Sequence, residues 1–318
     1  MDRNLAYLWT DDPEYALRFV SGIKDVEPEI QQVPGQSDLG SYLQDLFGNK
    51  PFYRGRFEAP GWAGGCIVKD APQSHFDLLI RQVREGRSLP APLFCIAGSS
   101  ECCHGQRNRP WCALDGNLHM AVLFKPNRDI SHFGPGFLAL AAVSVVETLD
   151  GVDGFRNRSG IKWVNDILID GAKVAGFLVH TVGTESLVQA AVLGLGLNIE
   201  TKPVFPPDPY VPRASSLSDL SLGSAGIARN DIVLPLLSQI HGNYGRLLDG
   251  KADGLIDAYR NRSVVIGKKC KVYDDPPPSG EGEEILASGL VDSIGPNLEL
   301  FFRGRKQAIT RGRLIILE

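Results

Sequence analysis

The sequence predicts an α+β fold, in which a mixed sheet covered by helices is followed by a small all-β module. Up to about residue 260, apolar strand-like runs share one block with amphipathic and apolar helical stretches. From about residue 263 the pattern changes to short strands separated by turns. Strands and helices in one block, followed by strands alone, are typical of an α+β domain with an appended barrel or sandwich.

Residues 1–60 are predicted to form an N-terminal extension whose role the sequence leaves open. Two short apolar runs, LAYLW and FYRGRFE, accompany two helical stretches. Residues 12–23 open with Asp-Pro, which favours a helix start, and residues 37–48 open with Ser and end in Gly, as capped helices do.

Residues 61–260 are predicted to form the main domain. Its first half holds an amphipathic helix at 74–86 and an apolar helix at 135–151 of the kind that covers a sheet. Runs typical of strands occupy residues 66–70, 89–98 and 118–126, and a polar loop spans 101–117.

The second half of this domain centres on a predicted β-hairpin. Strands at 161–170 and 173–182 are joined by Asp170-Gly171, a strong turn signal. A further strand is expected at 186–200. After it come a Pro-rich loop at 202–213, helices at 231–250 and 252–262, and a separate C-terminal domain at 261–318.

The composition excludes several classes of protein. A net charge of −4 provides no general basic surface for nucleic acid, and no apolar run reaches the roughly 18 residues of a membrane span. The N-terminus carries acidic residues where a signal peptide requires a basic start. Six cysteines without C-x-x-C spacing do not suggest a zinc ribbon. We therefore expect a cytoplasmic protein that binds neither nucleic acid nor membrane.

The predicted hairpin carries charges that a buried hairpin should not hold. Lys162, Asp166 and Lys173 lie among Trp, Val, Ile and Leu, and buried charges are costly unless they are paired or bind a ligand. Two lysines near one carboxylate suit adenylation, in which fixed cations offset the repulsion between a carboxylate and the α-phosphate of ATP. Asp166 can also hold Mg²⁺, which prefers carboxylate and phosphate oxygens.

The alternating glycines of "GLGLN", residues 194–198, admit two interpretations. They are either a strand turn that needs small residues or a place where the backbone closely approaches a ligand. The sequence around them does not decide between the two.

Together these motifs resemble the biotin protein ligases of the biotin/lipoate ligase superfamily. The K-W-P-N-D motif of that family is matched by residues 162–166 with Val164 in place of Pro, and its following K-x-A-G by residues 173–176 without a gap. Residues 194–198 match its G-x-G-[IVL]-N, and residues 259–272 are similar to the start of its SH3-like C-terminal domain. The likeness covers roughly residues 65–318.

The resemblance implies an ATP-dependent ligase that adenylates biotin and transfers it to a lysine of a biotin carboxyl carrier domain. ATP, Mg²⁺ and biotin as a small-molecule carboxylate would then bind, and the oligomeric state stays open, with a homodimer included. Lys173 would be the catalytic lysine that bridges the substrate carboxylate and the α-phosphate. The nucleotide and metal positions would be Lys162, Asn165, Asp166 and Asn198, with Asp166 as the metal ligand.

The sequence departs from the family in the glycine- and arginine-rich lid, residues 103–111. His104 and Gln106 occupy two arginine positions of the lid, and Ser100 replaces a glutamine before it. Residues 71–73, Ala-Pro-Gln, correspond to the Ser-Thr-Asn that hydrogen-bonds the biotin ring. The residues expected near substrate and adenylate are Ser100, His104, Gly105, Gln106, Arg107, Arg109, Trp111, Gly176, Gly194 and Gly196.

Three functional hypotheses therefore stay open at the level of sequence. The first is a divergent biotin protein ligase whose lid uses His104, Gln106, Arg107 and Arg109. The second is a ligase that adenylates another carboxylate. The third is a non-catalytic relative that binds nucleotide or carrier domain.

Overall fold

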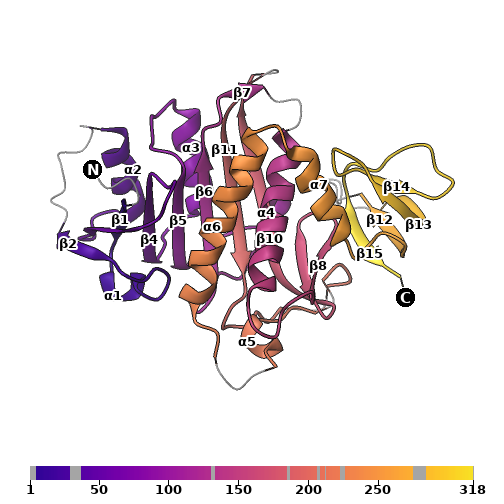
Figure 1. The fold of residues 1–318 in the computed structure, drawn as a ribbon, viewed down its shortest axis with the longest axis horizontal. Helices are drawn as coiled ribbons and strands as arrows, with labels where there is room; N and C mark the ends of the chain where they lie inside the picture. The colour runs from indigo at the N-terminus through magenta and orange to yellow at the C-terminus, as the bar shows by residue number, and fades with distance from the viewer. Residues whose placement is uncertain are drawn as a thin grey trace.

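The computed structural model confirms the α+β fold. A mixed sheet of eleven strands runs in the order β2-β3-β1-β4-β5-β6-β11-β10-β9-β8, with β7 paired to β11, and a four-stranded antiparallel sheet has the order β14-β13-β12-β15 (Figure 1). The structure describes residues 5–28, 37–129, 133–184, 187–205, 208–211, 213–222, 226–274 and 284–317.

The N-terminal extension adds three strands to the main sheet. It contains β1 (Leu5–Thr10), α1 (Pro13–Ala16), β2 (Lys24–Pro28), α2 (Asp38–Phe47) and β3 (Tyr53–Glu58). β1 pairs antiparallel with β3 and parallel with β4 (Gly64–Asp70), so the sheet continues across residue 60.

The two helices of the extension follow the sequence signals to different degrees. The helix expected at 37–48 is present as α2, with the Ser37 side chain accepting from the Gly40 amide and Gly48 at a φ of 62°. The helix expected at 12–23 is only one turn long, α1, although its cap, Asp12, was indicated by the sequence.

The centre of the sheet is buried on both faces. It is formed by β5 (Leu93–Ser99), β6 (Leu118–Phe124), β7 (Arg128–Asp129), β8 (Ser159–Lys162), β9 (Asp166–Ile169), β10 (Ala172–Gly183) and β11 (Leu187–Leu197). Along β6, Met120, Val122 and Phe124 belong to one core cluster, whereas Ala121 and Leu123 belong to the other. This alternation is the two-residue period of a strand with both faces covered.

Helices cover the two faces unequally. α4 (Phe133–Asp150), α6 (Arg229–Leu248) and α7 (Ala252–Asn261) pack together on the face seen in Figure 1, and α4 contacts β10 and β11. α3 (His75–Arg84) packs against β6 and β11 and contacts α2. The one-turn α5 (Leu217–Leu220) and the 3-10 turn η1 (Gln106–Asn108) lie in loops. Within the described residues, no helix is both long and apolar enough to cross a membrane.

The predicted hairpin is present, but its first strand is broken. Asp170 and Gly171 have φ values of 49° and 76°, as a two-residue turn between twisted strands requires. Residues 161–170 are not one strand: the chain reverses after β8, so that Lys162 pairs with Asp166 of β9. The indole of Trp163 donates to the carbonyl of Leu298 in the C-terminal domain at 2.6 Å, a distant anchor that the local pattern could not indicate.

The C-terminal domain lies at the β8 end of the main sheet, opposite the N-terminal strands (Figure 1). Its strands are β12 (Lys269–Tyr273), β13 (Ile285–Ile294), β14 (Leu300–Phe302) and β15 (Arg313–Ile316). The main core cluster continues into it through Cys270 and Val272, so the two sheets share apolar packing.

Replacing Phe57 with Ala should destabilise the whole main sheet. Phe57 is fully buried and meets Phe94 of β5 edge to face at 5.8 Å between ring centroids. We expect the free energy of unfolding to fall by about 3–5 kcal/mol in one shared transition, measured by urea denaturation.

Val26→Ala is the control, because Val26 is exposed and its loss should stay within about 0.5 kcal/mol. A separate early transition in Phe57→Ala, with the main transition unmoved, would mean that the extension folds independently.

Candidate active site

A cavity of about 720 Å³ lies between the start of α3, the 103–112 loop, the β8–β11 hairpins and the C-terminal domain. Gly194 and Gly196 of β11 continue the two-residue period of Ala190 and Val192, which belong to the core on the α3 face. The cavity therefore opens on the α3 side of the sheet.

Most of the predicted site residues meet at this cavity. Thirteen of them line it: Lys162, Asn165, Asp166, Lys173, Gly176, Gly194, Gly196, Asn198, His104, Gly105, Gln106, Arg109 and Trp111. Ser100 and Arg107 are not among the lining residues. The amide of Ser100 donates to the carbonyl of Ala113, which places it at the base of the loop.

The three charged residues of the hairpin converge. Lys173 Nζ lies 2.7 Å from Asp166 Oδ1, and both side chains are less than a fifth exposed. Lys162 is buried and donates to the carbonyl of Tyr210 at 2.5 Å. Burial, with the nearby positive charges of Lys173 and Arg313, lowers the pKa of Lys162 against the opposing effect of the carboxylates. Two lysines beside one close carboxylate leave positive charge to be neutralised, which suits an anionic ligand.

Aromatic rings pack directly against the glycines of β11, so the space beside these glycines is filled by side chains. A Cβ on Gly196 would lie 2.2 Å from the Trp111 ring, and one on Gly194 would lie 2.9 Å from Phe76. The Trp111 indole donates to Nδ1 of His119 at 3.2 Å, and Lys173 Nζ is 5.6 Å from the Trp111 ring centroid. Trp111 thus links the floor of the cavity to the charged hairpin.

The two asparagines of the site bond the backbone. The Asn165 amide donates to the carbonyl of Phe177 at 2.8 Å and ties the β8–β9 reversal to β10. The Asn198 amide donates to the carbonyl of Ser215 at 3.0 Å. Within the described residues, Oδ1 of Asn198 is buried and has no hydrogen-bond partner, so an acceptor is left at the cavity wall.

The loop predicted as a lid is fastened to α3. His104 Nε2 lies 2.8 Å from Asp77 of that helix, and the amide of Gly105 donates to the carbonyl of Arg109 at 2.7 Å. Burial alone would lower the pKa of His104, but hydrogen bonds to the Gly105 carbonyl and to Asp77 raise it overall. His104 therefore has a carboxylate partner within the protein.

The start of α3 brings to the cavity residues that sequence reasoning missed. Ser74, His75 and Phe76 line the cavity, whereas residues 71–73, which the resemblance aligns with the ring-binding Ser-Thr-Asn, do not. The chain reaches the cavity three residues later because α3 starts there, with the Ser74 hydroxyl accepting from the Asp77 amide at 3.3 Å. A Ser followed three residues later by Asp before an apolar run was the available signal.

Two buried imidazoles, of His75 and His119, belong to the wall of the cavity. Nε2 of His75 donates to the carbonyl of His119 at 3.0 Å, and Nε2 of His119 to the carbonyl of Leu114 at 3.0 Å. Burial lowers the pKa of each to about 4, helped for His75 by the charge of His119. Both rings are therefore neutral at pH 7.

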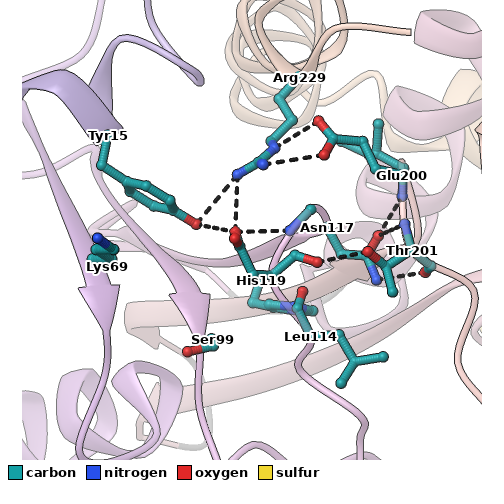
Figure 2. A network of polar contacts seen from close by, with 12 residues as sticks. Tyr15, Lys69, Ser99, Leu114, Asn117, His119, Glu200, Thr201 and Arg229 are labelled. Atoms are coloured by element: carbon teal, nitrogen blue, oxygen red, sulfur yellow. Dashed lines mark hydrogen bonds and ion pairs between the residues drawn. The ribbon is translucent and has the colours of Figure 1, made fainter. Parts of the chain in front are cut away.

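A polar network holds the segment that carries Leu114 (Figure 2). Asp115 accepts from Tyr15 Oη of α1 at 2.5 Å and from Arg229 Nη1 of α6 at 3.2 Å. Arg229, almost fully buried, also donates from Nε to Glu200 at 2.8 Å. The N-terminal extension thus helps to fix the ring of His119 at the cavity.

Comparisons with known proteins agree with this geometry. The model of the biotin/lipoate A/B protein ligase family matches residues 85–198. The biotin--[acetyl-CoA-carboxylase] ligase of Mycobacterium tuberculosis is 30% identical over 261 residues, 81% of this chain and 90% of that protein. The biotin protein ligase from Aquifex aeolicus, solved with biotin and ATP, has a TM-score of 0.61 at 17% identity, covering 80% of this chain and 98% of that chain.

Other relatives match over a shorter region. The bifunctional ligase/repressor BirA of Bacillus subtilis is 32% identical over 132 residues, which are 41% of this chain and 40% of that protein. This chain therefore spans less than half the length of that relative.

Replacing Gly196 with Ala should displace Trp111, because the new Cβ would overlap the indole ring. We expect a loss of about 1–3 kcal/mol in the free energy of unfolding and a changed tryptophan emission spectrum. Gly242→Ala on α6 is the control, since nothing lies within 4 Å of its Cβ and alanine should stabilise that helix. Matching results for the two variants would show that Trp111 is not packed on Gly196.

Stability should fall on acidification because of the two buried imidazoles. Their folded-state pKa values, about 4, lie below the value of roughly 6.5 in an unfolded chain. Their stabilising contribution is therefore complete above about pH 6.5 and is lost as the pH falls toward 4, on the order of 3 kcal/mol per ring. Urea denaturation between pH 4 and 7 should show that the free energy of unfolding depends less steeply on pH in His75→Gln than in the wild type. Parallel curves would argue against a neutral His75.

Proposed function

The chain belongs to the biotin/lipoate A/B protein ligase family, and we propose that it adenylates biotin with ATP and transfers the biotinyl group to a lysine of a carboxylase carrier domain. The observation that supports this most directly is the convergence of Lys162, Lys173 and Asp166 on one cavity. The ligase named in Mycobacterium tuberculosis is similar over most of its length, which extends the argument to the whole main domain.

Lys173 is the proposed catalytic residue. A carboxylate oxygen of biotin attacks the α-phosphorus of ATP, the bond to the bridging oxygen breaks, and pyrophosphate leaves. The ammonium of Lys173, 2.7 Å from Asp166 before ligand binds, then bridges the carboxylate and the α-phosphate and offsets the charge that both bring. In the second step the amine of the carrier lysine attacks the acyl carbon, and AMP leaves with the bonding electrons.

Lys162, Asn165 and Asn198 complete the proposed nucleotide side of the cavity. Lys162 contributes a buried positive charge, which an incoming phosphate would stabilise. Asn165 positions the reversal that carries Lys162 and Asp166. The free Oδ1 of Asn198 can accept from a donor of the adenylate.

Asp166 is the proposed ligand of Mg²⁺. The described residues contain no group of three or more His, Cys, Asp or Glu side chains that could hold a metal by themselves. One carboxylate is nevertheless sufficient for Mg²⁺ when nucleotide phosphates and water supply the other oxygens. The ion would neutralise phosphate charge beside Lys173.

Biotin would lie where the start of α3 and Trp111, which neighbours Lys173, line the cavity. Trp111 and Phe76 provide ring surfaces there, and Ser74 with the neutral His75 provides polar groups. Gly194 and Gly196 let these rings approach the backbone of β11, and Gly176 faces Trp111 from β10. His104, Gly105, Gln106 and Arg109 would close over the adenylate.

A ligase for another carboxylate is the second candidate. It is favoured by one observation: the family's ring-binding Ser-Thr-Asn has no counterpart at 71–73, and Ser100, in place of its glutamine, does not line the cavity. Groups that match a polar substrate strongly discriminate against analogues that lack the matching atoms. The identity of the substrate therefore depends on the Ser74–Phe76 end of the cavity.

Exchange of labelled pyrophosphate into ATP tests both candidates. We expect exchange that depends on biotin and is absent with lipoate or octanoate at the same concentration. Exchange with lipoate or octanoate alone would select the second candidate. No exchange with any carboxylate would leave a binding protein rather than a ligase.

Lys173→Ala should reduce this exchange by at least about 100-fold, as the loss of one transition-state cation does elsewhere. Lys173→Arg should not restore it, because a planar guanidinium does not replace a compact ammonium in a confined site. Lys251→Ala is the control, since Lys251 is exposed and forms a surface ion pair with Asp249. Comparable rates for Lys173→Ala and wild type would remove Lys173 from the mechanism.

A further inference from the structure

The C-terminal domain contributes an arginine to the cavity. Gly312, Arg313 and Leu314, at the start of β15, are among its lining residues. Gly312 has a φ of +122°, and a Cβ on it would lie 2.5 Å from the carbonyl oxygen of Tyr273. Only glycine fits this turn, so the approach of Arg313 to the cavity is determined by the backbone.

The guanidinium of Arg313 lies against the loop that faces the lysines. Its Cζ is 3.5 Å from the ring centroid of Tyr210, and Nη2 donates to Asp208 at 2.8 Å. Within the part of the chain that the structure describes, Nε of Arg313 is buried and has no hydrogen-bond partner. A buried charged donor without an acceptor is costly, so the guanidinium of Arg313 can still gain a hydrogen bond from a ligand.

Arg313 and Lys162 meet at one residue. Tyr210 carries the Arg313 guanidinium on its ring and accepts from Lys162 Nζ with its carbonyl. The charge of Arg313 is also one of the influences that lower the pKa of Lys162, after burial as the largest. With Lys173, three cations border this part of the cavity, against the carboxylates of Asp166 and Asp208.

Such an arrangement suits a polyanion longer than one phosphate. Asp166 forms an ion pair with Lys173, and Asp208 forms one with Arg313. Each of these cations could bind a phosphate in place of its carboxylate. Arginine is the side chain best suited to bind phosphate oxygens through two parallel N–H groups. The family's lid would supply arginines at positions 104 and 106, which here are His and Gln.

We propose that Arg313 binds the β- and γ-phosphates of ATP and the pyrophosphate that leaves, in place of the arginines that the lid lacks. The proposal rests on the proposed adenylation of a carboxylate. The phosphates compete with Asp208 for the guanidinium, and their oxygens can accept from the unsatisfied Nε. Arg313 makes no contact with the carboxylate substrate in this role.

Arg313→Met tests this in the full-length chain. The KM for MgATP and for pyrophosphate in the exchange reaction should rise roughly 10- to 100-fold, the range of a charge-assisted hydrogen bond. The KM for biotin should change less than about twofold, and Arg313→Lys should be intermediate. Arg311→Met is the matched control two residues away, because Arg311 is 66% exposed and pairs with Asp274 outside the cavity lining.

Calorimetry with magnesium pyrophosphate and no carboxylate separates this proposal from the proposed function, since it requires no turnover. Pyrophosphate should bind the wild type. Its affinity should fall roughly 10- to 100-fold in Arg313→Met, and it should rise several-fold in Asp208→Asn, which removes the competing carboxylate. Unchanged affinity in both variants, or no binding to wild type, would overturn the role of Arg313. If biotin supports no exchange while these changes in affinity appear, biotin is not the substrate, and the role of Arg313 in phosphate binding is retained. Should Arg313→Met not fold, Arg313→Lys and Asp208→Asn decide the question.

Discussion

Two lysines held beside one partly buried carboxylate are the constraint around which the cavity is built. The ion pair between Lys173 and Asp166 requires β9 and β10 to be neighbours in register, and the turn at Asp170-Gly171 provides that register. Lys162 reaches the same place only because the chain reverses between β8 and β9. The resulting surplus of positive charge is tolerable in a protein that binds polyanions and costly in one that does not.

The rest of the fold keeps this charged hairpin and the other walls of the cavity in fixed positions. Trp163 anchors the reversal to the C-terminal domain, and Tyr210 brings a loop over Lys162. On the other side, the network of Tyr15, Asp115 and Arg229 connects the extension and α6 to the segment before β6 (Figure 2). The described part of the N-terminal extension therefore belongs to the scaffold of the site, in addition to widening the sheet.

The hairpin and the neighbouring loop contribute different side chains to the cavity. The hairpin supplies two lysines and Asp166, whereas the loop predicted as the lid supplies His104, Gln106 and Arg109. His104 is paired with Asp77 and so fastens the loop to α3. A guanidinium from the C-terminal domain also borders the cavity, which makes the proposed phosphate site depend on both sheets.

Local features of this protein were determined by the sequence itself. The Asp170-Gly171 turn, the Ser37 cap and the apolar character of α4 depend on a few neighbouring residues, and each is present where it was expected. The spacing of Lys162, Asp166 and Lys173 also indicated a shared site, because residues on paired strands remain close even when one strand is broken.

Only the tertiary structure decided which distant segments complete the cavity. The break between β8 and β9, the three strands of the extension, the wall formed by Ser74–Phe76 and the approach of Arg313 all depend on contacts between residues far apart in the chain. Periodicity and capping signals report the conformation of a segment and the face that it buries. They carry no information about which other segment meets that face, since this is selected by the packing of the whole chain.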